Sequence, residues 1–216
     1  MKLICINKHY ILNEIEIKKL LVSSLLDDSN VDAVGSEVPF LFGRRRADIM
    51  SISNTVVTGY EIKSENDNIN ALANQLKDYR LYFDAVVVVC EPANIKKIRE
   101  IAPRWVGLNV VTRNSVKKLR SPKIFKIQNK MALLSTITSI QLRRISKPTP
   151  NVSTHELCQL LTKLKTFSDI KALSRSNLRD RYQLPTEIIR KESYKQLNSD
   201  DLIIITKPRS SAFRKL

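Results

Sequence analysis

The stretch GYEIKSE, residues 59–65, places a glutamate and a lysine two positions apart in a strand-like run. In an extended chain the side chains at i and i+2 point to the same face, so Glu61 and Lys63 share one face. Tyr60 and Ile62 then take the other face. A strand that only has to pack gains nothing from this charged pair, so the stretch predicts a strand with a function on one face.

The segments around this stretch predict a mixed α/β fold built on one sheet. The helical spacing of Ile17, Leu20, Leu21 and Leu25 predicts a first helix. The continuous apolar run AVVVVC is typical of a strand covered on both faces of a sheet. The predicted order is a helix at 13–26, strands at 36–43, 47–53 and 55–64, a helix at 72–83, a strand at 85–90, a helix at 94–101 and a strand at 107–113.

The second half of the chain has a different character. Beyond residue 115 strand-like runs become rare, and lysine-rich helical patterns dominate. The segment KPTPNVST, residues 147–154, predicts a linker. Helical patterns follow at 155–164, 168–173 and 187–197, and an apolar run closes the region at 202–206. We therefore expect a core at 1–114, a basic connecting region at 115–150 and a small helical domain at 151–216.

The charge of the chain is concentrated in this second half. The formal net charge is +16, and residues 115–216 hold 22 Lys and Arg against 7 Asp and Glu, whereas residues 1–114 are nearly balanced. A one-sided positive stretch attracts polyanions, chiefly nucleic acid, with a solubilising surface or a patch for acidic lipid as the alternatives. We expect affinity to lie in residues 115–216 and chemistry in residues 1–114.

Several classes of protein are disfavoured by what the sequence lacks. No apolar run approaches the roughly 18 residues of a membrane span, and the start of the chain does not read as a secretion signal. Three cysteines without CxxC spacing favour a reducing cytoplasm and no thiolate zinc site. The two histidines, His9 and His155, argue against histidine–metal nucleases.

Two predicted neighbouring strands carry acids that can meet. Asp48 opens the strand at 47–53, and Glu61 and Lys63 lie on the next one. Adjacent strands are about 4.8 Å apart, so an acid on each can share a divalent cation. A lysine beside that cation can position a nucleophilic water or stabilise charge on a phosphate. These parts suit metal-assisted hydrolysis of a phosphodiester, and a structural ion-pair cluster is the alternative.

The order RRAD (45–48), strand, GYEIKS (59–64) resembles the PD-(D/E)XK nuclease superfamily. The pattern E-hydrophobic-P, GRRAD and EIKS is similar to small bacterial and phage members related to MmcB-type DNA-repair proteins. The specific match covers residues 37–64, and Ala47 stands where the name-giving proline would be. The resemblance implies a restriction-endonuclease-like mixed sheet flanked by helices, with Mg²⁺ or Mn²⁺ as cofactor and with Asp48, Glu61 and Lys63 at the site.

Further residues join the expected site through the same resemblance. QLKDY (75–79) resembles the Q-x-x-x-Y of RecB-like nucleases, which adds Gln75 and Tyr79, although Tyr79 also reads as a core aromatic. The family pattern favours Glu37 as a third carboxylate, with a solvated edge-strand charge as the alternative. It also implies a metal-orienting glutamate on the first helix. We prefer Glu16, which aligns with the start of the family helix, over Glu14.

Together these features predict a metal-dependent endo- or exonuclease in repair, recombination or the processing of phage or mobile-element DNA, with DNA favoured over RNA as the substrate. The alternatives are a non-catalytic nucleic-acid-binding protein that keeps the fold and a phage or mobile-element accessory protein that acts through a host partner. The resemblance also allows a homodimer, since such nucleases often pair to cut both strands. The residues expected to contact nucleic acid are Arg44, Arg45, Arg46, Lys117, Lys118, Arg120, Arg143 and Arg144.

Overall fold

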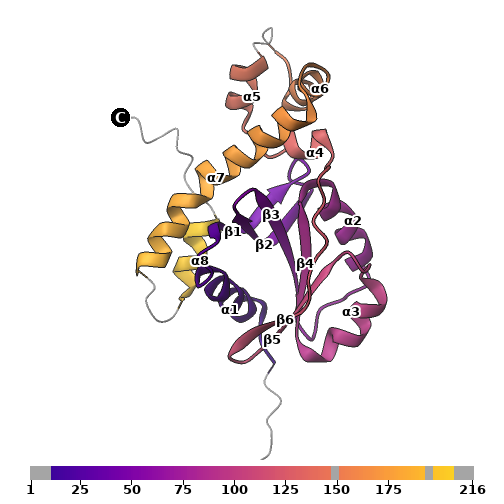
Figure 1. Ribbon diagram of the computed structural model, residues 1–216, viewed down its shortest axis with the longest axis vertical. Coiled ribbons are helices and arrows are strands. Elements are labelled where there is room, and N and C mark those ends of the chain that lie inside the picture. Colours follow the sequence, from indigo (N-terminus) through magenta and orange to yellow (C-terminus); the bar gives the residue numbers. More distant parts are fainter. Residues whose placement is uncertain (1–10, 147–150, 193–196, 207–216) are drawn as a thin grey trace, which may run out of the picture.

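The computed structural model describes residues 11–146, 151–192 and 197–206. Its first part holds α1 (Glu14–Leu26), β1 (Val31–Phe40), β2 (Arg45–Ser53), β3 (Val56–Lys63), α2 (Leu72–Tyr82), β4 (Ala85–Cys90), the 3-10 turn η1 (Pro92–Asn94), α3 (Ile95–Ile101), β5 (Gly107–Thr112) and β6 (Ser115–Arg120). Five helices follow: α4 (Lys130–Leu134), α5 (Ser139–Ser146), α6 (Thr154–Leu164), α7 (Phe167–Glu192) and α8 (Ser199–Thr206). The chain is thus a mixed α/β protein, as predicted (Figure 1).

All the described strands form one six-stranded mixed sheet in the order β1-β2-β3-β4-β5-β6. The first three strands form an antiparallel meander, β4 and β5 then add in parallel to β3, and β6 returns antiparallel to β5. Every residue of β4 is buried, which confirms the central position expected from its unbroken apolar run. Helices α2 and α3 are the crossovers that parallel strands require.

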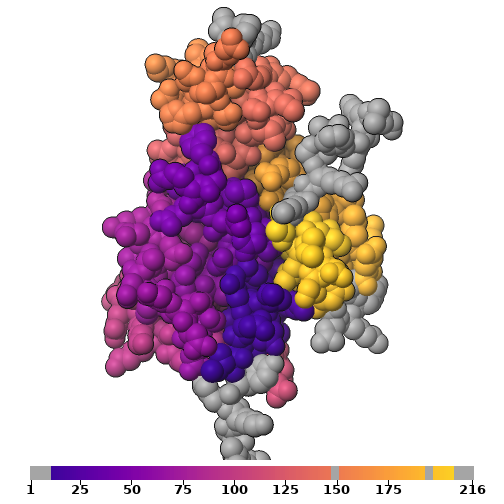
Figure 2. Space-filling model, turned by 180° about the vertical axis from the view of Figure 1, so that it is seen from behind, coloured from indigo at the N-terminus to yellow at the C-terminus, as the bar shows by residue number. Residues whose placement is uncertain are grey.

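Helices cover the two faces of the sheet with separate apolar cores. On one face α1, α8 and Ile189 of α7 pack against Ile49, Tyr60 and Ile62. On the other face α2 and α4–α7 pack around a cluster of aromatic rings that includes Phe40 and Tyr79. Figure 2 shows α1 and α8 side by side on the surface, although they are far apart in the sequence.

Gly59, the first residue of the stretch GYEIKSE, is required by close packing. A Cβ atom added there would lie 2.7 Å from the ring of Phe83, which is fully buried. The ring therefore lies flat against the backbone of β3, where only a glycine leaves room. This contact helps to fix α2, which ends just before Phe83, over the strand that carries Glu61 and Lys63.

The long helix α7 covers the outer edge of β1, the first strand of the sheet. The Thr186 hydroxyl accepts a hydrogen bond of 2.8 Å from the Val34 N–H, and Arg190 donates to the Val31 carbonyl at 2.8 Å. Tyr182 of α7 lies over Gly35, where an added Cβ would meet its ring at 2.7 Å. An edge strand left open would pair with other chains, so α7 stabilises the sheet by covering it.

The structure corrects several element boundaries. The strand expected at 36–43 spans Val31–Phe40, because its first residues pair with the end of β2. The helical patterns at 168–173 and 187–197 do not form separate helices within the described residues, since α7 runs without a break from Phe167 to Glu192. The run 202–206 belongs to α8. Residues 147–150 of the expected linker lie outside the described residues, and α6 begins at Thr154, close to its predicted start.

The expected boundary at residue 114 falls between two paired strands. β6 extends the sheet beyond it, because Val116 lies opposite Val111 of β5. Leu178 and Tyr182 of α7 belong to the same buried cluster as Phe40 of β1. A chain cut after residue 114 would expose this core. The contribution of each half to nucleic-acid affinity is therefore measured by substituting charged residues rather than by truncation.

Candidate metal centre

The candidate site lies where the β2–β3 hairpin opens. The last backbone pair of the two strands is Ile49 with Tyr60. Beyond it the Asp48 side chain replaces the backbone ladder, because its Oδ2 accepts a hydrogen bond of 2.7 Å from the Ile62 N–H. Backbone pairing between the two strands therefore ends next to Asp48 and Glu61.

Glu61 and Lys63 share one face of β3, as their spacing predicts. Lys63 Nζ lies 2.7 Å from Glu61 Oε1, and the two side chains are only 11% and 4% exposed. Tyr60 and Ile62 belong to the core on the opposite face. A buried charged pair is costly for folding alone.

Tyr79 of α2 completes this group. Its hydroxyl donates a hydrogen bond of 2.6 Å to Glu61 Oε2, so both carboxylate oxygens of Glu61 have a partner. Burial raises the pKa of Tyr79 well above its ordinary value, which keeps the hydroxyl protonated as a donor. Tyr79 also packs in the aromatic core, which confirms the interpretation of it as a core aromatic.

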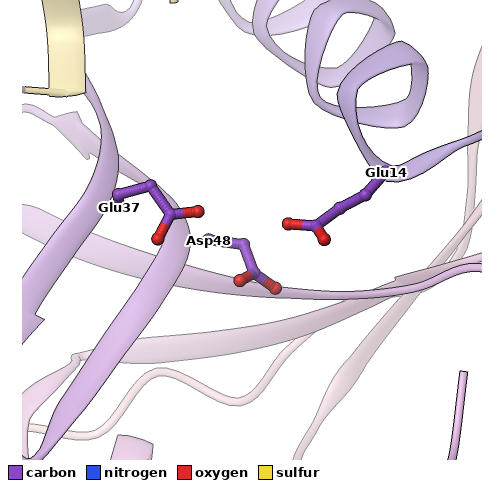
Figure 3. Close-up of side chains that lie close together, drawn as sticks. All are labelled: Glu14, Glu37 and Asp48. Atoms are coloured by element: carbon purple, nitrogen blue, oxygen red, sulfur yellow. The ribbon is translucent and has the colours of Figure 1, made fainter. Parts of the chain in front are cut away.

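Three carboxylates converge beside this group from three different elements. Glu14 of α1, Glu37 of β1 and Asp48 of β2 each offer an oxygen, and these oxygens lie within 4.8 Å of one another. Figure 3 shows the three side chains pointing toward a common space between α1 and the sheet. Carboxylate oxygens are the ligands that Mg²⁺ and Mn²⁺ prefer, so the donor set fits either ion.

Glu37 reaches this space through an unusual backbone conformation. Its φ is 51°, in the left-handed region, although it lies inside β1. Such a conformation costs on the order of 1 kcal/mol for a residue with a side chain, and it turns the side chain away from the regular alternation of the strand. The strain favours a role for the Glu37 carboxylate over the edge-strand alternative.

A lysine already holds two of the carboxylates. Lys18 of α1 forms an ion pair of 2.6 Å with Glu14 and a hydrogen-bonded ion pair with Glu37. Lys18 is 7% exposed. Burial alone would lower its pKa, but the hydrogen bonds to Glu14 and Glu37 raise it overall, so Lys18 stays charged. The acidic group is therefore partly neutralised from within the chain.

Asp48 is the electrostatically strained member of the group. Burial and the neighbouring charge of Glu61 raise the pKa of Asp48 from 3.8 to about 7, against the hydrogen bond from Ile62 that lowers it. The Asp48 carboxyl is therefore harder to ionise in this position than in water.

Of the two glutamates at the start of α1, Glu14 rather than the preferred Glu16 lies beside Glu37 and Asp48. Glu16 Oε2 accepts a hydrogen bond of 2.8 Å from the Asn13 N–H, and Asn13 in turn caps the helix through the Glu16 N–H. This capping box turns Glu16 toward the helix start, whereas Glu14, the alternative, points to the sheet. Lys18 was missed, although its spacing of four residues from Glu14 places both on one helix face. Gln75 is half-buried on α2, and its Oε1 lacks a partner among the described residues.

The basic residues expected to contact nucleic acid lie in three places. Arg44, Arg45 and Arg46 follow the turn after β1, where Arg45 pairs with Asp78 at 2.6 Å and Arg46 Nη1 lies 3.4 Å from Glu37. Lys117 and Lys118 are exposed on β6, while Arg143 and Arg144 are exposed on α5 toward the other end of the molecule (Figure 1).

Two of these residues also have bonds within the chain. Arg120 Nε donates to the Val106 carbonyl at 2.7 Å, and Arg143 Nη2 donates to the Val152 carbonyl at 2.6 Å. The positive charge of the second half is thus spread over both ends of the molecule, which does not favour a single continuous surface.

The fold and this group of side chains define a mixed α/β protein with a carboxylate and lysine cluster at an opened hairpin. The chain belongs to the family described as bacteriophage P4 protein cII, whose model matches residues 7–206. It is 22% identical over 214 residues to protein cII of Enterobacteria phage P4, an alignment that covers 92% of this chain and 80% of the relative.

A solved protein of unknown function from Silicibacter pomeroyi is also similar, with 17% identity and a TM-score of 0.42 over 63% of this chain and 93% of that one. None of the helices within residues 11–146, 151–192 and 197–206 is both long and apolar enough to cross a membrane.

Proposed function

We propose that the protein is a divalent-metal-dependent nuclease of the PD-(D/E)XK type that hydrolyses phosphodiester bonds of DNA. The observation that carries the proposal is the arrangement around Asp48: Glu61, Lys63 and Tyr79 on one side and the carboxylates of Glu14 and Glu37 on the other. These residues come from five different elements, α1, β1, β2, β3 and α2, and lie between positions 14 and 79 of the chain. A fold that needed only stability would have little reason to gather them there.

Each residue would have a distinct task in this reaction. Asp48, with Glu61, Glu37 and Glu14, would hold Mg²⁺ or Mn²⁺, which when bound supplies a Lewis acid for the phosphate. The Lys63 ammonium would orient the attacking water and stabilise negative charge on the phosphate oxygens. Tyr79 would keep the Glu61 carboxylate in place through its hydrogen bond of 2.6 Å. Arg44 and Arg46 would contact the phosphate backbone, since both are exposed beside the site.

One observation favours the alternative, a nucleic-acid-binding protein that keeps this arrangement without turnover. Lys18 neutralises Glu14 and Glu37 directly, as a metal ion otherwise would. A carboxylate group that is satisfied by a lysine can be stable without any metal. The two functions differ in whether a divalent ion binds and in whether DNA is cut.

The nuclease proposal is tested by incubating the purified full-length chain with labelled single-stranded, duplex, nicked and branched DNA and with RNA. Parallel reactions contain Mg²⁺, Mn²⁺, Ca²⁺ or chelator. We expect products only with Mg²⁺ or Mn²⁺ and with DNA. Binding of DNA in every reaction without any product would instead establish the non-catalytic function.

Removing the internal cation is expected to strengthen metal binding. In Lys18→Met the ammonium no longer competes for Glu14 and Glu37, so we expect Mn²⁺ affinity to rise about tenfold, equivalent to ~1.4 kcal/mol. Calorimetric titration of the variant with Mn²⁺ measures this change. Lys19→Met, at the next position of α1, is the matched control and should leave the affinity unchanged. Unchanged or weaker binding in Lys18→Met would show that Lys18 and the metal do not compete.

A further inference from the structure

A second polar site lies at the other end of the β2–β3 hairpin. A cavity of about 300 Å³ opens between the hairpin turn and the first turns of α7. Asn54 and Thr55 at the turn are six or seven residues from Asp48, which corresponds to roughly 20 Å along a strand. The cavity is therefore separate from the candidate metal centre. Its lining includes Thr55, Phe167, Ser168, Lys171, Arg175 and Arg179.

Three cations line this cavity at regular helical spacing. Lys171, Arg175 and Arg179 follow one another at four-residue intervals, so they lie along one face of α7. Two carboxylates oppose them. Lys171 and Arg175 pair with Asp84 at 2.7 Å and 3.0 Å, and Arg179 pairs with Asp32 at 3.0 Å. One positive charge remains in excess, at a cavity whose lining residues include no carboxylate.

The central cation has hydrogen-bond donors to spare. The Arg175 side chain is 10% exposed, and its Nη2 donates to Asp84 and to the Tyr82 carbonyl at 2.9 Å. Its Nε and Nη1 are buried and have no acceptor among the described residues. A buried donor without an acceptor costs about 1–3 kcal/mol, and more when the group is charged. An anion that reached this guanidinium would remove that cost.

The backbone contributes in the same direction. Phe167 and Ser168 belong to the first turn of α7, a helix of 26 residues, so the positive end of its dipole lies at the cavity. The hydroxyls of Ser168 and Thr55 are further donors in the lining. The Thr166 hydroxyl and N–H hydrogen-bond to the carboxylate of Asp169 in the same turn, which satisfies that acid locally.

We propose that this cavity is a phosphate-binding pocket, in which Lys171, Arg175 and Arg179 hold the phosphate of a nucleotide or of a nucleic-acid terminus. The guanidinium fork of an arginine matches the oxygens of a phosphate, and the Phe167 ring beside it offers an apolar surface for an attached sugar or base. The pocket requires no metal, so this assignment does not depend on the proposed nuclease activity.

The proposal is tested with the full-length chain in chelator at fixed ionic strength, where cleavage cannot occur. The probes are inorganic phosphate, a nucleoside 5′-monophosphate, and one DNA oligonucleotide with either a 5′-phosphate or a 5′-hydroxyl. We expect saturable binding of phosphate, and a loss of about tenfold or more in Lys171→Gln and in Arg179→Gln. Lys163→Gln, an exposed charge on α6, is the control and should bind as tightly as the unmodified chain.

The probes also separate the two sources of phosphate. A preference for the 5′-phosphate oligonucleotide that is lost in Lys171→Gln assigns the pocket to nucleic-acid termini. Binding of the monophosphate with equal affinity for both oligonucleotides assigns it to a free nucleotide. The proposal is overturned if phosphate and the monophosphate show no saturable binding, or if Lys163→Gln loses as much affinity as Lys171→Gln. Circular dichroism of each variant confirms that the fold is retained.

Discussion

Cleavage of DNA is expected to fall at least a hundredfold in each of the variants Asp48→Asn, Glu61→Gln and Lys63→Met. Removing a positioned proton donor or acceptor, or one group that stabilises transition-state charge, commonly costs 10²–10⁴-fold in rate. The nearly isosteric changes at Asp48 and Glu61 preserve the hydrogen bonds from Ile62 and Tyr79 while removing the charge. Single-turnover cleavage at saturating metal measures the rate.

The matched control for this series is Asp180→Asn, an exposed carboxylate on α7, which should cleave as fast as the unmodified chain. Affinity for DNA, measured in chelator, should stay within about twofold in all variants, because one exchanged group changes few of the phosphate contacts. Full activity in any of the three site variants would remove that residue from the mechanism. A parallel loss of DNA affinity would assign it to binding instead of chemistry.

The second large effect is a gain in stability from the same Asp48→Asn substitution, measured without metal. The pKa of Asp48 is raised from 3.8 to about 7 in the folded chain, so the folded state binds the proton more tightly than the unfolded state. The contribution of Asp48 to stability therefore falls as the pH rises from about 4 to about 7, and stays at the lower level above that. At ~1.4 kcal/mol per pKa unit, this shift of about 3 units corresponds to a loss on the order of 4 kcal/mol over the whole range.

Asparagine does not ionise, so Asp48→Asn should escape this loss. Urea unfolding in chelator at pH 4.5 and at pH 7.5 should show that the variant becomes more stable than the unmodified chain at the higher pH, by on the order of 2–4 kcal/mol relative to the difference at the lower pH. Asp180→Asn should show no such change. Destabilisation of Asp48→Asn at pH 7.5 would instead identify Asp48 as part of a structural ion-pair cluster.

The contrast between these two experiments separates function from structure. A residue that only stabilises the fold lowers the stability when it is removed. A residue that is kept for chemistry or for metal binding can lower the stability while it is present, because its charge is buried beside Glu61. An inactive and more stable Asp48→Asn would be the result expected of a functional site.

Much of the fold follows from local patterns in the sequence. The alternation in GYEIKSE predicts that Glu61 and Lys63 lie on one face of β3. The distance of 2.7 Å between Lys63 Nζ and Glu61 Oε1 confirms this prediction. The helices α1, α2, α3 and α6 and the strands β2–β5 lie close to their predicted positions, because apolar periodicity reports which face of an element is buried. The missed strand β6 is an edge strand with exposed Lys117 and Lys118, so it lacks this periodicity.

The candidate site shows where local patterns stop being informative. The residue types of the site and the pairing of Glu61 with Lys63 could be predicted, since they depend on spacing within one strand. The capping role of Glu16 could also have been predicted, because Asn13 and Glu16 have the spacing of a capping box. The approach of Glu14 to Glu37 and Asp48 could not, because it depends on how α1 is rotated against the sheet. The position of Lys18 between two carboxylates depends on the same rotation, and the turn of Glu37 toward them depends on a left-handed backbone that no residue type announces.

The sequence by itself determined the order of the elements from α1 to β5, the central strand and the charged residues of β3, because each depends on residues a few positions apart. Only the tertiary structure decided which acids meet, how α7 closes the edge of β1, and that the phosphate-binding pocket forms between a hairpin turn and a helix more than a hundred residues later. Contacts between distant segments depend on the packing of two cores, and the free energy of that packing is shared among many buried side chains. No short stretch of the sequence carries that information.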